Sequence, residues 1–142
     1  MKKAVWIILG VVLFFFISCK KGPDYVTVQH ILIAFKGSIP KDSVKRTRFE
    51  AELLVKEIFK RAKRGDDFDK LVKNFTDDQY PGIYRIANFD IEPDKSQEEY
   101  SRSSMVKAFG DLSFKLPVGG IGLAKYDPEN CKYGWHIIKR IE

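Results

Sequence analysis

The chain has 142 residues, a net charge of +6 at neutral pH, two cysteines and two histidines. This length suits a single domain. The positive charge includes no basic tract longer than a few residues, which argues against a nucleic-acid-binding protein. The sequence also shows no internal repeat and no low-complexity tract.

The first 18 residues have the pattern of a targeting segment rather than of a folded element. Lys2 and Lys3 precede an uncharged run of 15 residues, Ala4 to Ser18. At about 1.5 Å per residue this run spans only roughly 22 Å, which is short of the ~30 Å hydrocarbon core of a membrane. We therefore expect residues 1–18 to be a secretory signal peptide.

Cys19 follows this run directly, in the order Phe16-Ile17-Ser18-Cys19. A small residue before a cysteine resembles a bacterial lipobox, in which the thiol becomes lipidated, although Phe16 stands where Leu or Val is usual. Residues 19–24 would then form a lipidated linker. The alternative is an uncleaved short anchor. Both predict a domain outside the cytoplasm, held at a membrane of a bacterial cell envelope.

Removal of the signal peptide changes the composition of the chain. It leaves 124 residues with a net charge of +4, because Lys2 and Lys3 are lost. If Cys19 carries lipid, Cys131 is the only other thiol, so no internal disulfide can form. The apolar core must then stabilise the domain, residues 25–142, alone.

The domain begins with an apolar strand followed by two helices. Residues 25–35 form two apolar faces in alternation, which is typical of a buried strand. Thr47 and Glu50 have the spacing of a capping box, and apolar residues at helical spacing continue from there until Gly65. Asp66 or Asp67 then caps a second helix, whose apolar face consists of Phe68, Leu71, Val72 and Phe75.

The second half of the domain has weaker patterns. Residues 82–89 have strand character, and the polar residues 90–101 indicate an exposed excursion. Ser103 or Ser104 can cap a short helix, on which Met105 and Phe109 would share one face. Strands follow at residues 121–126 and 133–141. This order, without βαβ repetition, predicts an α+β domain whose first and last strands are antiparallel neighbours.

The two histidines lie in similar apolar runs at opposite ends of the domain. His30 stands in Val28-Gln29-His30-Ile31-Leu32-Ile33, and His136 stands in Gly134-Trp135-His136-Ile137-Ile138-Lys139. A buried imidazole is costly unless it is hydrogen-bonded, because it loses its water. The matching contexts therefore predict that the two strands pair and bring the rings together.

Further short strings occur in a fixed order from Val26 to Glu142. They are His30-Ile31-Leu32-Ile33, Arg46-Thr47 to Glu50-Ala51, Gly65-Asp66-Asp67-Phe68, Phe75-Thr76-Asp77-Asp78, Met105 with Ala108-Phe109, Phe114-Lys115-Leu116 and Tyr133-Gly134-Trp135-His136-Ile137-Ile138. Together they resemble the parvulin family of peptidyl-prolyl cis-trans isomerases. The resemblance implies a parvulin-like four-stranded antiparallel sheet flanked by three to four helices.

The resemblance also implies a set of site residues. It places His30 and His136 beneath the floor of the active site, and Asp78 at a position that holds cysteine or aspartate in family members. Met105 and Phe109 would receive the proline ring of the substrate, with Tyr84 or Ile83 as an apolar wall.

Two features depart from the family. The glycine-rich segment after the second helix is reduced to Pro81-Gly82-Ile83-Tyr84. An insertion of about a dozen residues separates this segment from Met105. Both departures concern the wall and the rim of the implied site.

The implied activity requires neither a cofactor nor a metal. Rotation about a peptide bond costs ~18–20 kcal/mol because amide resonance is lost. For X-Pro the two isomers lie within about 1 kcal/mol of each other, so a catalyst only has to lower the barrier. An apolar socket and polar groups that fit the twisted amide suffice. The expected partners are unfolded or extended X-Pro-containing polypeptides, and the expected role is assistance to the folding of exported proteins.

Three alternatives remain open. The first is a parvulin-fold chaperone that binds extended chains with little turnover, which the insertion favours. The second is that the histidine pair only stabilises the sheet and takes no part in catalysis. A metal site is not favoured, because the sequence lacks the usual spacing of zinc ligands. The third concerns a basic stretch beside the expected entrance, which is either a solvated loop or a determinant of preference for acidic residues before proline. Its residues are Lys36, Lys41, Lys45, Arg46 and Arg48.

Overall fold

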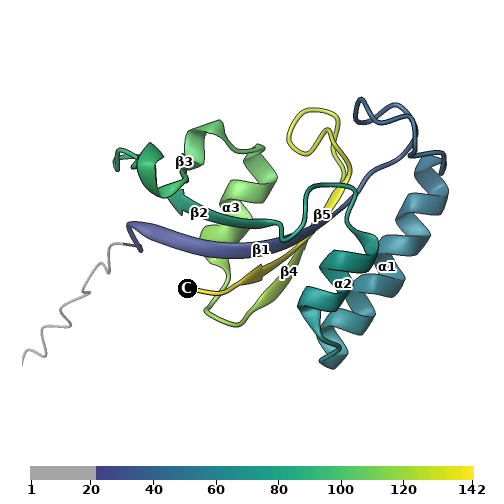
Figure 1. The fold of residues 1–142 in the computed structure, drawn as a ribbon, viewed down its shortest axis with the longest axis horizontal. Helices are drawn as coiled ribbons and strands as arrows, with labels where there is room; N and C mark the ends of the chain where they lie inside the picture. The colour runs from purple at the N-terminus through teal and green to yellow at the C-terminus, as the bar shows by residue number, and fades with distance from the viewer. Residues whose placement is uncertain (1–21) are drawn as a thin grey trace, which may run out of the picture.

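The computed structural model describes residues 22–142. The predicted signal peptide and the predicted lipidation site Cys19 lie outside the described residues. Eight helices and strands follow each other with two short 3-10 turns (Figure 1). They are β1 (Tyr25–Ile33), α1 (Arg48–Arg64), α2 (Phe68–Phe75), β2 (Ile83–Ala87), η1 (Lys95–Gln97), β3 (Glu99–Ser101), η2 (Arg102–Ser104), α3 (Lys107–Lys115), β4 (Ile121–Ala124) and β5 (Trp135–Arg140).

The strands form one sheet in the order β3-β2-β1-β5-β4. All neighbours are antiparallel except β2 and β3, which are parallel. The predicted α+β class and the pairing of the first with the last strand are confirmed. The sheet has five strands rather than four, because part of the segment expected to be an exposed excursion returns to the sheet edge as β3.

The helices cover both faces of the sheet. One face packs Ile31, Ile33 and Ile137 against apolar residues of α1 and α2. The other face packs Val28 and Ile138 against α3, which lies on the opposite side of the sheet (Figure 1). Because side chains alternate along a strand, the even-numbered residues of β1 all face α3, and His30 is among them.

Local capping signals set the ends of the first two helices. The Thr47 hydroxyl accepts from the Glu50 N–H while the Glu50 carboxylate accepts from the Thr47 N–H, so the predicted capping box is present. Gly65 ends α1 in the left-handed region, at a φ of 102°. Asp67 caps α2 through the Lys70 N–H, whereas Asp66 pairs with Arg61. Both helix boundaries therefore follow from side chains close in the sequence.

Gly134, directly before β5, lets the chain pass close to the backbone of Ile33. Its φ is 140°, and a Cβ added there would lie 2.2 Å from the carbonyl oxygen of Ile33. Only glycine fits so close to a neighbouring backbone. The next two residues, Trp135 and His136, thereby pair with Ile33 and Leu32 at the end of β1.

Among residues 22–142, no helix has the length and apolar composition needed to cross a membrane.

Candidate active site

A pocket of about 500 Å³ opens on the α3 side of the sheet. Its lining comes from segments far apart in the sequence and consists of His30, Leu32, Ile39, Pro40, Lys41, Asp77, Asp78, Gln79, Tyr84, Ser104, Met105, Val106, Phe109, Tyr133 and His136. Six of the residues predicted for the site are in this set. Ile83 is not among them, because it precedes Tyr84 in β2 and its side chain points to the other face.

The two histidines are hydrogen-bonded to each other at the base of the pocket. Their Nδ1 atoms lie 3.2 Å apart, and Nε2 of His30 lies 3.0 Å from Oδ2 of Asp78. Both rings are buried. In the register of β1 and β5, His30 is opposite Ile138 and His136 is opposite Leu32, so the two rings are diagonal neighbours on one face.

The hydrogen bonds assign the proton positions. A carboxylate only accepts, so Nε2 of His30 donates to Asp78, and Nδ1 of a neutral His30 then accepts. Nδ1 of His136 must therefore carry the proton that joins the rings. This leaves Nε2 of His136 as a buried lone pair, in agreement with its lack of a hydrogen-bond partner.

Electrostatics favour an ionised Asp78 and a neutral His136. The hydrogen bond from His30 is the main cause of a lowered pKa for the Asp78 carboxyl, helped by the Gln79 N–H and the Tyr84 hydroxyl. Burial, and then the neighbouring His30, lower the pKa of His136 to about 3. Burial, and then the charge of Asp78, raise the pKa of Tyr84, whose hydroxyl donates to Oδ2 of Asp78 at 3.0 Å. One carboxylate thus carries the charge of the pocket floor.

Aromatic rings surround this polar group. The ring of Phe109 meets those of His30 and His136 edge-on, with centroids 5.1 and 5.3 Å apart. The ring of Tyr84 meets His30 in the same manner at 5.2 Å. Met105 is partly exposed and packs in the same apolar cluster as Phe109. The pocket therefore offers an apolar recess next to the carboxylate of Asp78.

The prediction that Met105 and Phe109 share a helix is wrong. Met105 has extended backbone angles and follows the 3-10 turn η2, while α3 begins only at Lys107. The Ser104 N–H donates to the hydroxyl of Ser101, and the Ser104 hydroxyl donates to the Ser101 carbonyl. Ser104 is thus used inside the turn, and neither Ser103 nor Ser104 caps the helix.

A tertiary contact replaces the expected cap of α3. Val106 occupies the cap position without a side-chain hydrogen bond. The N–H of Ala108 in the first turn instead donates to the carbonyl of Asn130, at 3.0 Å. A backbone group from a distant loop therefore satisfies one of the free amides at the start of α3.

Arg102 holds the segment before Met105 in place and was not anticipated from the sequence. Its guanidinium lies between the rings of Phe89 and Phe114, at 4.4 and 4.5 Å from their centroids. It also donates to Asn88 at 3.0 Å and to Asp111 at 2.8 Å. Its carbonyl accepts from the Met105 N–H. One side chain thus connects the insertion to α3 and fixes the approach to Met105.

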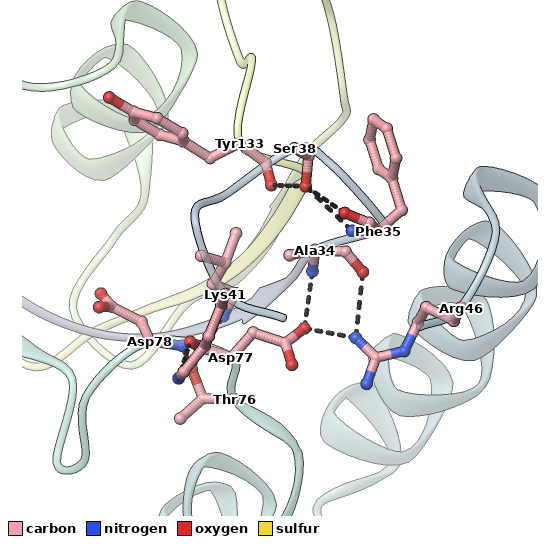
Figure 2. Close-up of polar contacts among 10 residues, drawn as sticks. Ala34, Phe35, Ser38, Lys41, Arg46, Thr76, Asp77, Asp78 and Tyr133 are labelled. Carbon is pink, nitrogen blue, oxygen red and sulfur yellow. Dashed lines mark hydrogen bonds and ion pairs between the residues drawn. The ribbon is translucent and has the colours of Figure 1, made fainter. Parts of the chain in front are cut away.

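Asp77 organises the rim of the pocket, as Figure 2 shows. Its carboxylate accepts from the Ala34 N–H at 2.8 Å and from the guanidinium of Arg46. Its carbonyl accepts from Nζ of Lys41 at 2.7 Å. Arg46 is therefore already paired, and of the five basic residues considered above only Lys41 lines the pocket.

A second contact holds the loop that follows β1. The Ser38 hydroxyl donates toward the carbonyl of Tyr133, at 2.9 Å, next to the Phe35 carbonyl (Figure 2). The loop after β1 is thus joined to the chain before β5. Tyr133 lines the pocket together with Asp78.

An α+β fold in which a pair of buried histidines lies under an apolar pocket is typical of the parvulin-type peptidyl-prolyl isomerases. The chain belongs to the PPIC-type PPIASE domain family, whose model matches residues 12–142. It thus contains a PPIC-type peptidyl-prolyl isomerase domain.

Relatives named for roles in folding cover most of this chain. Foldase protein PrsA 4 of Bacillus cereus is 32% identical over 100 residues, which is 70% of this chain and 31% of that protein. Chaperone SurA of Pseudomonas syringae pv. tomato is 28% identical over 116 residues, which is 82% of this chain and 22% of that protein. The chain therefore spans less than a third of the length of these relatives.

Solved structures share the fold. The solution structure of TbPIN1 has a TM-score of 0.61 at 21% identity, covering 84% of this chain and 98% of that one. The crystal structure of PrsA from Bacillus subtilis has a TM-score of 0.52 at 22% identity, covering 84% of this chain and 35% of that one.

The neutral state of His136 has a consequence for stability. Its pKa of about 3 lies below the ordinary value of 6.5, so between these values the unfolded chain binds one more proton than the folded chain. The free energy of unfolding should therefore fall as the pH is lowered from 6.5, by up to about 1.4 kcal/mol per pH unit. Urea unfolding between pH 7 and 4.5 measures this slope.

The matched variant is His136→Gln, which cannot take up the proton. The free energy of unfolding of this variant should fall less steeply with decreasing pH, by the contribution of close to one bound proton. Carboxyl groups contribute to both slopes alike, so the difference between the two slopes reports on His136. Equal slopes for the two proteins would contradict a neutral, buried His136.

Arg102 should contribute to stability and to the position of Met105. Arg102→Ala should lower the free energy of unfolding by about 2–4 kcal/mol, because two ring contacts and two charged hydrogen bonds are lost. Lys107→Ala is the control, since Lys107 also pairs with Asp111 but is 70% exposed, and it should cost less than about 1 kcal/mol. The methyl resonance of Met105 should shift in the first variant only. An unchanged resonance would refute the positioning role.

Proposed function

We propose that this chain is an active isomerase that assists the folding of exported polypeptides, with the pocket between β1, β5 and α3 as its site. The observation that carries this proposal is the carboxyl group of Asp78, which is hydrogen-bonded to His30 and Tyr84 beside an apolar recess. The names of the relatives, foldase and chaperone, agree with a role in folding. His30, His136 and Asp78 would be the polar residues of the site, and Met105, Phe109 and Tyr84 would bind the proline ring.

The recess and the carboxylate would act on different parts of the amide. Burial of the proline ring against Met105 and Phe109 removes water from the amide next to it. Resonance in a planar amide places negative charge on the carbonyl oxygen, and this charge is lost when the bond twists. A carboxylate near that oxygen disfavours the planar form relative to the twisted one. Asp78 would thereby lower the barrier by binding the transition state better than the ground state.

The histidines would orient and not react. His30 holds Asp78 through Nε2, and His136 holds His30 through Nδ1. Three of the four ring nitrogens are hydrogen-bonded, and the fourth, Nε2 of His136, is buried. No ring nitrogen is therefore available to attack a substrate. The pair would fix the position and the charge of the carboxylate.

A protease-coupled assay on a proline peptide tests the activity. Asp78→Asn removes the charge and keeps the shape, and it should lower kcat/KM at least about tenfold, equivalent to ~1.4 kcal/mol of the barrier. Met105→Ala should mainly raise KM. Met105 is preferred to Phe109 for this purpose because Phe109 is only 4% exposed and belongs to the core. Phe49→Ala, at a residue 69% exposed on α1, is the control and should leave turnover unchanged.

The same protein also tests the alternative function. Absence of turnover in the unsubstituted chain, together with suppressed aggregation of an unfolded client, would contradict the isomerase proposal. It would favour a parvulin-fold chaperone instead. The insertion that contains β3 is the observation that keeps this second function in view.

We further propose that residues 1–18 are a signal peptide and that Cys19 carries the lipid that holds the domain at an envelope membrane. The support is the sequence alone: two lysines, an uncharged run and a small residue before the cysteine. Residues 19–24 would then form the short lipidated linker between the anchor and the domain.

Lipid labelling in cells tests the anchor. Cys19→Ala should abolish incorporation of a labelled fatty acid and leave an unprocessed precursor on a gel. Cys131→Ala is the control and should keep the label, since Cys131 is buried. Labelling that persists without Cys19 would refute the lipid anchor.

A further inference from the structure

A second recess, of about 710 Å³, adjoins the proline pocket. One bank is the segment from Gln79 to Tyr84, and the other is formed by residues 93–101, which belong to the insertion at the β3 edge of the sheet (Figure 1). Gln79, Tyr84 and Ser104 line both recesses. We call this second recess the insertion groove. It exists only because the insertion returns to the sheet.

Tyr84 forms the partition between the proline pocket and the insertion groove. On one side its ring contacts His30, and on the other it meets the ring of Tyr100 at a centroid distance of 5.2 Å. Its hydroxyl is bound to Asp78. The two recesses therefore meet at a side chain that is held from both sides.

The banks of the groove present two exposed tyrosines beside charged residues such as Lys95 and Glu98, on a fixed frame. Tyr80 is 52% exposed and its hydroxyl is bound to Asp69, while Tyr100 on the opposite bank is 42% exposed. The strand that carries Tyr100 is held by its pairing with β2 and by the ion pair of Glu99 with Arg85, at 2.8 Å. Exposed tyrosines in a preformed recess supply contact area at little entropic cost.

From this continuity we propose that the insertion groove binds the client residues next to the proline, with an apolar or aromatic side chain between Tyr80 and Tyr100. The inference rests on the proposed function of the proline pocket. A client whose proline occupies that pocket continues as an extended chain, at about 3.3 Å per residue. The chain of the client then passes Tyr84 and enters the insertion groove. The insertion thus selects the residues that flank the X-Pro bond.

Peptides of two lengths test this proposal in the isomerase assay. The short peptide contains the X-Pro bond with one residue on each side. Two long peptides extend this core by two residues, one of them Phe. In one long peptide the extension precedes the core, and in the other it follows the core. One of the extensions should lower KM about three- to tenfold in the unsubstituted protein, the effect of one well-placed aromatic contact. Tyr100→Ala should remove this gain, so that its short and long peptides have the same KM, whereas Tyr100→Phe should keep it. Phe49→Ala is the control for loss of an exposed ring.

A binding readout is independent of turnover. The amide resonances of Lys95–Ser101 should shift on titration with the favoured long peptide and stay unchanged with the short one. Equal KM values for all peptides, or the same loss for short and long peptides in Tyr100→Ala, would overturn the proposal. Failure of the proposed function is a different result, since it would abolish turnover of the short peptide as well.

Discussion

The pairing of β1 with β5 is the constraint on which the rest of the structure depends. It joins residues 106 positions apart and places His30 and His136 diagonally on the face covered by α3. A shift of either strand by one residue would turn its histidine toward α1 and α2. A shift of β1 would also remove the hydrogen bond from His30 to Asp78. Gly134, which tolerates the close approach to Ile33, protects this register.

Much of the fold could be predicted because its signals are local. The capping box at Thr47, the glycine after α1 and the alternation in the first strand each involve neighbours in the sequence. The strand β3 could not be predicted in this way. It has three residues, and it exists because Glu99 pairs with Arg85 and the backbone pairs with β2. Such a strand depends on tertiary contacts more than on propensity.

The same division applies to the candidate site. His30 and His136 could be predicted to meet, because buried histidines need partners and the two strands match, whereas Asp78 was implied only by the family resemblance. The place of Met105 could not, since it depends on Arg102, whose partners Phe89 and Phe114 come from separate segments. Asp77 reads as a solvated turn in the sequence, yet it is bonded to Ala34 and Arg46. Polar residues that bridge distant segments leave no periodic signal.

The central position of β1 has a mechanical consequence. Residues before Tyr25 lead directly into this strand, which is paired with β2 on one side and β5 on the other. Tension on these residues, for example from a membrane tether, would act along the strand axis and load both ladders in shear. Many hydrogen bonds must then break together rather than one after another. A domain held by this end can therefore resist the pull of a polypeptide that it binds, with its histidine pair still in register.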